Sequence, residues 1–314
     1  MRYTLLLLPF TTAIKISYRK VGQVRLPLYI STLTVLFSIF FNYLFIFGSW
    51  GLPAMGGSGA GLGTLLARII ELLICLGFTI KISSPIKLKP HLLRGIQTSV
   101  IKSFTRRGTQ IVLNELLWAM GMQVLIVIYT QRSGFNLAAY SIAQTFAGLI
   151  KVGMSGINTP IFIILGGHLG RSEFGKAQED ARKLLKFSFS MGCVLGVLVL
   201  GLSQFILPFY QVDEMTLGAA RQLILVSASF SGFVYLNVAY FFIFSAGGDT
   251  RSVLILDSLF TWVVMIPAAF LLSFTGLALS LHFLAVQFLE IAKIGVARWR
   301  YQQGHWLKNL TTAS

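Results

Sequence analysis

Charged side chains inside apolar stretches are the residues of this sequence most able to do chemistry. Glu115 is the fifth residue of an apolar stretch that begins at Ile111, and Lys151 lies near the middle of another stretch, residues 139–165. A charge at such a depth is costly unless it is paired or faces a cavity. A carboxylate can take up a proton or a metal cation, so Glu115 is the candidate coupling group. The alternative is a glutamate that reaches back to the cytoplasmic surface or caps a kink.

Lys151 is too far from either end of its stretch to reach the surface easily. We expect its ammonium group to pair with the Glu115 carboxylate on a neighbouring helix and to be released when Glu115 is protonated. A lysine that lines an aqueous cavity is the alternative.

The elements that must position these groups are membrane helices. Hydrophobic residues make up 55% of the 314 residues and charged residues only 11%, and the mean hydropathy is +0.76. This composition excludes a water-soluble globular domain and predicts an all-α, polytopic transmembrane bundle. The apolar stretches do not alternate as barrel strands would. They lie at residues 3–17 (a short one), 28–47, 59–82, 111–129, 139–165, 184–209, 223–246, 254–272 and 277–296.

The basic residues predict the orientation. The net charge is +16, but the lysines and arginines are concentrated in alternate loops rather than in one stripe with interleaved aromatic residues. We therefore expect no nucleic-acid partner; the basic loops face the cytoplasm and contact anionic membrane lipids. The chain is then a multi-pass protein of the cell (plasma or inner) membrane whose basic C-terminal segment lies in the cytoplasm, and nine spans would put Met1 outside if the short first stretch crosses.

Two short similarities suggest an internal repeat. Gly22 and Gly248 each begin a loop motif and lie 226 residues apart, and Glu71 and Glu290 occupy later apolar stretches 219 residues apart. A parallel repeat of six helices is a transporter architecture. We expect residues 1–90 to form a truncated N-terminal lobe and residues 91–314 a complete C-terminal lobe. The second loop motif consists of Gly248, Asp249, Thr250 and Arg251.

The other acids within apolar stretches have structural explanations. Asp257 lies one and a half helical turns after Arg251, which predicts an ion pair or a cap. Glu71 follows Arg68 by three residues, and Glu290 precedes Lys293 by three, so each predicts a local ion pair that packs its lobe.

Several motifs in order resemble the MATE (multidrug and toxic compound extrusion) family of transporters. The second lobe of that family is similar to residues 113–118 (LNELLW), 165–170 (LGGHLG), 246–251 (AGGDTR) and 306–310 (WLKNL), and the end of its first lobe to residues 42–48 (NYLFIFG) and 68–73 (RIIELL). Family members have twelve helices. The resemblance therefore implies that this chain corresponds to helices four to twelve and lacks roughly the first three.

The resemblance implies cation-coupled export of organic cations or drugs, driven by H⁺ or Na⁺. Some members use a glutamate at the position of Glu115 together with an aspartate on helix ten. The matching stretch, residues 232–240, has no acid, and this departure favours a proton carried with the help of Tyr235 and Asn237. In the first lobe the resemblance points to Ser38, Asn42 and Thr64, where no acid stands. We expect coupling to come from the second lobe.

Substrate contacts are expected from polar and aromatic residues, although most aromatic residues in membrane helices pack or face lipid. The candidates are Asn114, Trp118, Tyr140, Gln144 and Tyr240, with Ser38, Asn42 and Thr64 of the first lobe. The sequence contains no Walker loop, metal-ligand cluster or catalytic triad, so we expect neither an enzyme nor a cofactor or bound metal other than a transported ion.

Three hypotheses remain from the sequence. The first is a MATE-like antiporter of a small organic cation or amphipathic substrate, with a separate chain as one source of the missing helices. The second is a truncated remnant that transports nothing, because Gln23 and Val24 replace the acid and threonine of the second loop motif. The third is a flippase for a lipid-linked saccharide, which a basic cavity around Lys151 would suit.

Overall fold

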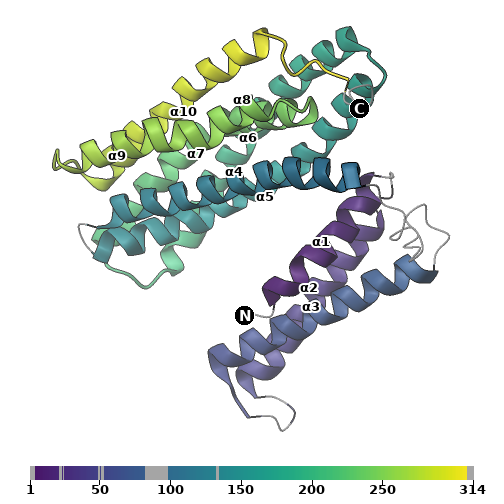
Figure 1. Cartoon of the computed structure of the whole chain (residues 1–314). Coiled ribbons are helices and arrows are strands. Elements are labelled where there is room, and N and C mark those ends of the chain that lie inside the picture. The colour runs from purple at the N-terminus through teal and green to yellow at the C-terminus, as the bar shows by residue number, and fades with distance from the viewer. Residues whose placement is uncertain are drawn as a thin grey trace. The chain divides into compact units, whose positions relative to one another are not determined.

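A computed structural model describes residues 4–20, 23, 25–48, 50, 53–81, 98–131 and 134–309 of the chain (Figure 1). The described residues form nine helices and no strands, which confirms the all-α prediction. The bounds are α1 Thr4–Lys20, α2 Arg25–Phe47, α3 Gly56–Lys81, α4 Thr98–Thr130, α5 Gly134–Gly170, α6 Phe174–Ile206 with the short η3 Leu207–Phe209, α7 Glu214–Ala246, the continuous α8 Thr250–Leu254, η4 Ile255–Leu259, η5 Thr261–Met265 and α9 Ile266–Ser273, and α10 Leu279–Gln302.

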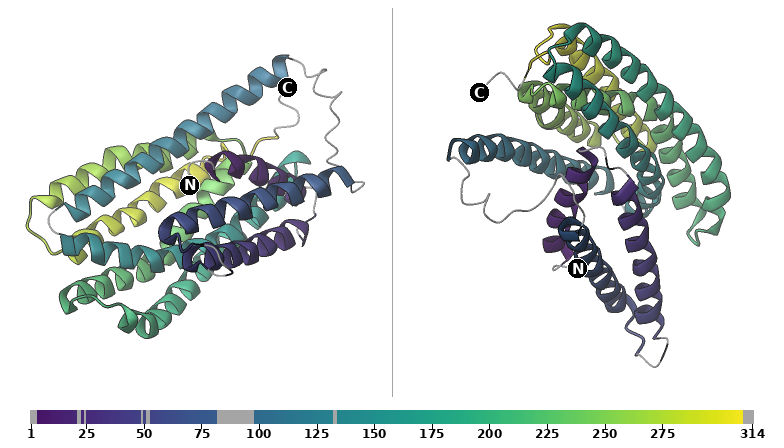
Figure 2. Two further views of the ribbon diagram at one scale, coloured as in Figure 1. Left: turned by 90° about the horizontal axis from the view of Figure 1, so that it is seen from below. Right: turned by 90° about the vertical axis from the view of Figure 1, so that its right-hand side faces the viewer.

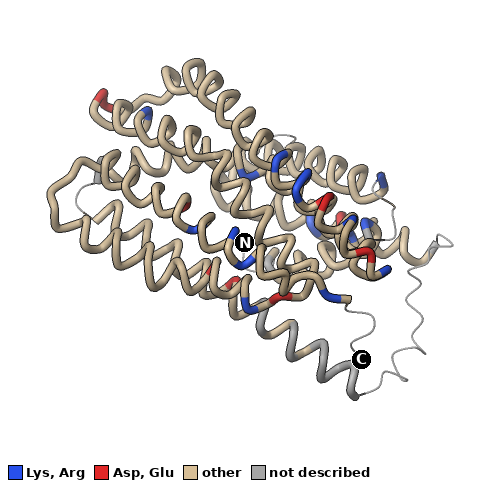
Figure 3. The backbone as a smooth tube through the Cα atoms, turned by 90° about the horizontal axis from the view of Figure 1, so that it is seen from above, with Lys and Arg blue, Asp and Glu red and all other residues tan. Residues whose placement is uncertain are grey.

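Eight helices in the described part of the chain are long and apolar enough to cross a membrane. The chain is thus a multi-pass membrane protein, and the eight longer predicted stretches are confirmed. Helix α1, with 17 residues, falls outside this group, so its crossing remains a prediction. Figure 3 shows why these helices suit a hydrocarbon environment: Lys, Arg, Asp and Glu interrupt long stretches of backbone that carry no charge.

The chain divides into two compact units, Met1–Ile101 and Lys102–Ser314. Unit 1 contains α1, α2 and α3, and α3 packs along both other helices. Small residues let α2 and α3 approach closely, because a Cβ atom at Gly59 would lie 2.4 Å from the Phe45 carbonyl oxygen. Close backbone approach of this kind is the usual way in which membrane helices gain packing energy.

Unit 2 is built around α7, which packs against α5, α6 and α10 (Figure 2). Its side chains are buried on several sides, including Tyr235, Ile243 and Phe244. The contact with α6 depends on Gly192 and Gly196, where an added Cβ would approach backbone atoms of α7 to 2.8 Å or less. Helix α7 is therefore the central element against which the polar groups of unit 2 are positioned.

The helix Thr250–Ser273 is irregular in its middle. Residues 255–259 (η4) and 261–265 (η5) adopt π-helical hydrogen bonding, and Pro267 follows near the start of α9. A π-helical turn inserts an extra residue and re-aims the side chains near it, and such turns are frequent at functional sites. Asp257 lies in the first of these segments.

Candidate functional site

A polar cluster joins α4 to the first π-helical segment in unit 2. The Asn114 side chain donates a hydrogen bond from Nδ2 to Asp257 Oδ2 at 3.1 Å, and Ser258 Oγ donates to Asn114 Oδ1 at 2.7 Å. Asn114 is 3% exposed and Ser258 is 3% exposed. The amide thus satisfies both of its ends inside the protein and fixes the position of the Asp257 carboxylate.

Asp257 also faces a cation from another helix. Lys293 of α10 places its Nζ 4.0 Å from Asp257 Oδ1, and both side chains are largely buried, with 13% and 15% of their surface exposed. Glu115 lies near enough to Asp257 for the two negative charges to interact. The Glu115 side chain is exposed in unit 2 and has no hydrogen bond or ion pair within the described residues. Asp257 therefore interacts with one lysine and with one further carboxylate.

A third carboxylate, Glu290, lies on α10 and is held by an amide rather than a cation. Asn237 of α7 donates from Nδ2 to Glu290 Oε2 at 2.6 Å and to the Glu290 carbonyl oxygen at 2.9 Å. Asn237 is 6% exposed. The sequence prediction that Glu290 pairs with Lys293 is wrong, because Lys293 points to Asp257 instead.

A cavity of about 140 Å³ opens among the helices of unit 2 beside this carboxylate. Its lining includes the predicted residues Tyr140, Gln144 and Lys151, together with Tyr129 and Glu290. Gln144 Nε2 donates to the Tyr140 hydroxyl at 2.6 Å. The lining holds one lysine and one glutamate, so the two formal charges of the cavity cancel.

Lys151 does not pair with Glu115, contrary to the prediction. Its side chain is exposed at the cavity, and it has no ion pair in the described part of the chain. The reason lies in the helix faces: the polar face of α4 at Asn114 packs against η4, whereas Lys151 on α5 opens to the cavity shared with Glu290. The structure thus fits the alternative, in which Lys151 lines a cavity.

The remaining predicted residues of unit 2 lie apart from this cavity lining. The Tyr235 hydroxyl donates to the Ile150 carbonyl oxygen at 2.5 Å and so braces α5. Tyr240 is buried and its ring lies 5.8 Å from that of Tyr301. Trp118 is half-buried on α4. These positions give Tyr235 and Tyr240 packing roles, while Asn114 belongs to the polar cluster described above.

Unit 1 holds its own buried acid. Glu71 is fully buried, with Oε1 2.5 Å from Lys15 Nζ and Oε2 2.7 Å from Arg68 NH1. The predicted pair with Arg68 is confirmed, and Lys15 of α1 adds a second cation. All three groups line a cavity of about 360 Å³ together with Ser38 and Thr64.

The first-lobe expectation needs a correction, because an acid does line the cavity that contains Ser38 and Thr64. That acid is Glu71, and two cations already hold it. The third predicted residue, Asn42, donates to Ser38 Oγ at 3.5 Å and lies against Gly63. The sequence offered no sign of this arrangement, since Lys15 and Glu71 are 56 residues apart.

The loop motif of unit 2 begins a helix and anchors another one. Asp249 caps α8 by accepting hydrogen bonds from the Ser252 backbone nitrogen at 3.2 Å and Ser252 Oγ at 2.5 Å. Arg300 of α10 donates to the same Ser252 hydroxyl at 2.9 Å. Gly248 has a φ of +69°, which glycine adopts at little cost, and Arg251 is exposed. The predicted Arg251–Asp257 ion pair is wrong, because among the described ion pairs Asp257 contacts Lys293 and not Arg251.

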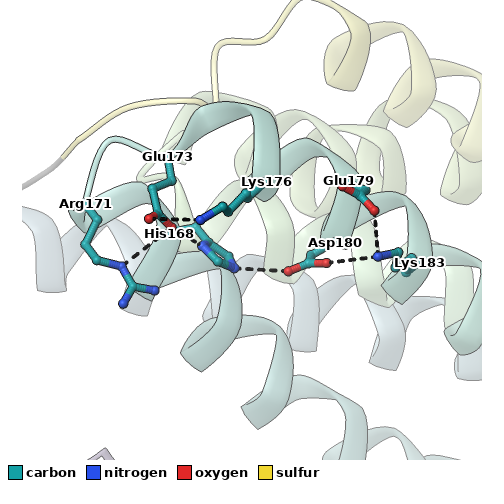
Figure 4. A network of polar contacts seen from close by, with 7 residues as sticks. All are labelled: His168, Arg171, Glu173, Lys176, Glu179, Asp180 and Lys183. Atoms are coloured by element: carbon teal, nitrogen blue, oxygen red, sulfur yellow. Dashed lines mark hydrogen bonds and ion pairs between the residues drawn. The ribbon is translucent and has the colours of Figure 1, made fainter.

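A charged network closes the turn between α5 and α6 (Figure 4). His168 places Nδ1 2.7 Å from Glu173 Oε2 and Nε2 3.0 Å from Asp180 Oδ2. The His168 ring therefore joins two carboxylates, Glu173 and Asp180, from opposite sides of the imidazole. The hydrogen bonds from His168 and then Lys176 hold the pKa of the Glu173 carboxyl below its ordinary value of 4.5.

Three motifs that are distant in the sequence meet at this end of unit 2. Asn309 donates from Nδ2 to the Gly170 carbonyl oxygen at 3.2 Å and to Ser172 Oγ at 2.8 Å. The Trp306 carbonyl oxygen lies so close to Gly247 that an added Cβ would stand 1.9 Å from it. The segments around residues 168, 247 and 306 thus form one folded end.

Sequence reasoning missed Asp257, Lys293 and Glu290 as members of a functional cluster. Each was assigned a local pairing role from its spacing along one helix. The feature that singles out Glu115, a charged side chain within an apolar stretch, also applies to Asp257, Lys293 and Glu290 and could have identified them. Their mutual contacts run between α4, η4, α7 and α10, and spacing along a single helix cannot show such contacts.

Comparison with known proteins agrees with this architecture. The MatE family model matches residues 111–271. Multidrug resistance protein MdtK of Pectobacterium atrosepticum is 26% identical over 243 residues, which cover 77% of this chain and 53% of that protein. The chain therefore spans about half the length of this curated relative.

Solved structures show the same fold at low identity. A MOP superfamily transporter from Pyrococcus furiosus superposes with a TM-score of 0.84 at 16% identity, and the match covers 97% of this chain and 68% of that chain. That structure is described as having a binding pocket of reverse polarity. A multidrug resistance MATE family transporter in an outward-facing conformation gives a TM-score of 0.82, at 16% identity, and also covers 97% of this chain and 68% of that one.

Proposed function

Because the chain belongs to the MatE family, whose members are transporters rather than enzymes, we propose that it takes part in cation-coupled export of small organic cations or drugs across the cell membrane. Residues 1–90 would correspond to family helices four to six and residues 91–314 to helices seven to twelve, with the C-terminus in the cytoplasm. The similar protein from Pectobacterium atrosepticum is a multidrug resistance protein, which supports this substrate class.

The observation that carries the proposal is the cluster of carboxylates in unit 2. Glu115, Asp257 and Glu290 lie in membrane-spanning helices, and among the described residues only Asp257 of these three has a lysine within ion-pair distance. A charged carboxylate without a counter-ion is costly in a membrane, so protonation or a bound cation would stabilise the other two. The cluster is therefore suited to exchanging an external cation for an organic one.

We favour a proton over Na⁺ as the coupling ion. The ammonium group of Lys293 already faces Asp257, and it would repel a metal ion placed there. A sodium ion also requires several oxygen ligands, whereas Asn114 Oδ1 accepts a hydrogen bond from Ser258. A proton needs only one free carboxylate oxygen, which Glu115 offers.

The uptake step that we propose starts at Glu115. Its protonation removes the negative charge of Glu115 beside Asp257, while the contact between Asp257 and Lys293 remains. Glu290, at the cavity, would hold the positive group of the organic cation beside the rings of Tyr129 and Tyr140. Lys151 shares that cavity and would repel the cation, which favours its release.

Ethidium efflux from cells that express the chain tests the proposal, measured at two external pH values with and without Na⁺. We expect Glu115→Gln and Asp257→Asn to lower the pH-driven efflux at least about tenfold, since removing a coupling group abolishes its step. Glu214→Gln changes an exposed acid at the start of α7 and serves as the control. We expect its efflux to equal that of the wild type.

Efflux that persists in both cluster variants would contradict the assigned coupling role. Efflux that depends on Na⁺ and not on pH would contradict the proton. If the wild-type chain reaches the membrane and exports nothing, the proposal fails for this chain by itself. Co-expression with a chain that carries the first three family helices then distinguishes a part of a transporter from a remnant.

A further inference from the structure

The cavity of unit 1 has a charge balance opposite to that of the carboxylate cluster in unit 2. Its lining contains two cations, Lys15 and Arg68, and one acid, Glu71. The acid is fully buried between the two cations. The cavity of about 360 Å³ therefore has a formal charge of +1, within three helices that are otherwise largely apolar.

Both cations retain hydrogen-bond donors. A lysine ammonium has three N–H groups and an arginine guanidinium has five. In the described structure Lys15 and Arg68 each make one hydrogen bond to a protein group, and each bond ends on Glu71. Their side chains are 17% and 32% exposed, so the remaining donors are accessible from the cavity rather than covered by packing.

The hydroxyl groups of the lining divide into two kinds. Thr34 and Thr64 donate to carbonyl oxygens of their own helices, at 2.8 and 2.9 Å, so their protons are already used. Ser38 accepts a weak hydrogen bond from Asn42 and keeps its own proton for donation. Ser31, the fourth hydroxyl of the lining, makes no hydrogen bond within the described residues. The donors available to a ligand therefore come from the two cations, Ser31 and Ser38, and they suit an acceptor with several oxygens.

The rest of the lining is apolar and includes Val35, Ile39 and Ala67. A volume of about 360 Å³ falls in the range of small-molecule sites. A second cation would meet a net positive charge there, whereas one anion would neutralise it. The lining thus combines a positively charged part, at Lys15 and Arg68, with an apolar part.

We propose that this cavity binds the carboxylate of an amphipathic organic anion through Lys15 and Arg68, with Glu71 holding the two cations in position. The acidic group accepts hydrogen bonds from the ammonium and guanidinium groups, and the apolar part of the ligand lies against Val35 and Ile39. This site is separate from the coupling cluster, and its binding does not depend on whether the chain exports cations.

The test measures binding of dansyl-labelled undecanoic acid by fluorescence, with the full chain in nanodiscs of phosphatidylcholine. The methyl ester of the same probe has the same apolar part without the charge. Empty nanodiscs give the lipid background. We expect the acid to bind at least about tenfold more tightly than the ester, because charge-assisted hydrogen bonds to two cations are lost in the ester.

Arg68→Gln removes one of the two cations and disturbs the folded unit little, because Lys15 still pairs with Glu71. We expect it to weaken binding of the acid about tenfold and to leave the ester unchanged. Ser38→Asp adds a negative charge to the lining and should remove the preference for the acid. Arg25→Gln removes a positive charge from the exposed start of α2, outside the lining, and is the matched control.

Equal affinity of the wild type for acid and ester would overturn the proposal. So would an Arg68→Gln variant that is folded, as judged by size-exclusion chromatography, and binds the acid as the wild type does. A loss of acid binding in Arg25→Gln equal to that in Arg68→Gln would also overturn it, because the effect would then come from the general positive charge of unit 1.

Discussion

The two units place acidic residues in membrane helices in different ways. In unit 1, Glu71 is fully buried and both of its oxygens contact cations from α1 and α3. In unit 2, Asp257 faces one lysine at 4.0 Å, Glu290 is held by an amide, and Glu115 has no hydrogen bond or ion pair within the described residues. A carboxylate with a complete set of protein partners is fixed, whereas one that lacks them can exchange a proton. The difference gives Glu71 a structural role and agrees with the coupling role that we propose for the acids of unit 2.

The largest expected effect is on the stability of unit 1. Glu71→Gln leaves Lys15 and Arg68 without their counter-ion, and breaking a buried pair of this kind costs about 3 kcal/mol. Thermal unfolding in detergent measures the change. Glu115→Gln in unit 2 is the matched control, and we expect its unfolding temperature to equal that of the wild type, because Glu115 has no partner to lose.

A triple replacement sharpens the same test. Lys15→Met, Arg68→Met and Glu71→Met together remove all three charges and leave side chains of similar length. Replacing a buried ion cluster by apolar residues is often neutral, so we expect most of the stability lost in Glu71→Gln to return. If Glu71→Gln alone proves as stable as the wild type, the contrast between the two units is wrong.

A smaller effect is expected from the amide that holds Glu290. Asn237→Leu removes the hydrogen bonds to Glu290 Oε2 and to its carbonyl oxygen, at a cost of about 1 kcal/mol. The loss is limited because Asn237 Oδ1 is itself buried without a partner in the described structure. Gln287→Leu, which changes another polar residue of the same cavity lining, should leave thermal unfolding unchanged. If Asn237→Leu instead destabilises the protein by about 3 kcal/mol or more, Glu290 would be a carboxylate fixed by its protein partners, as Glu71 is.

The smallest effect belongs to the water-exposed turn between α5 and α6. The pKa of Glu173 is lowered by the folded structure, chiefly by the hydrogen bond from His168. The carboxylate therefore contributes stability above its unfolded pKa of about 4.5, and that stability is lost as the pH falls through the lower folded value. We expect Glu173→Gln to weaken the loss of stability below pH ~4.5 in thermal unfolding curves.

The control for this prediction is Glu179→Gln, whose carboxylate contacts only the exposed Lys183 among the described ion pairs. Its unfolding should follow the wild-type pH profile more closely than that of Glu173→Gln. An identical acid dependence in wild type and Glu173→Gln would show that the network does not contribute to stability.

Much of the fold follows from the sequence. The apolar stretches predict α2 to α10 well, because a membrane helix must satisfy its own backbone hydrogen bonds and its length is set by the bilayer. The Arg68–Glu71 pair was also predictable, since residues three apart lie on one face of a helix. The start of α4 was not, because Thr98–Gln110 is too polar to be read as part of an apolar stretch.

The contacts between helices could not be predicted in this way. Spacing along one helix suggested that Lys293 would contact Glu290 and that Arg251 would contact Asp257, and both suggestions are wrong. The packing of α10 against α7 and η4 turns Lys293 toward Asp257 and leaves Glu290 to Asn237. The π-helical turn at Asp257 adds a change of direction that no periodicity of 3.6 residues describes.

The sequence by itself determined that this chain spans a membrane, that its helices carry a few charged residues, and that its motifs resemble one transporter family. Those properties depend on composition and local order, which are written directly in the residues. Only the tertiary structure decided which charges meet. Glu71 gained Lys15 as a second cation beside its neighbour Arg68, and Glu115 has no ion pair within the described residues, because partners as distant as 56 residues are chosen by the packing of helices and not by position in the chain.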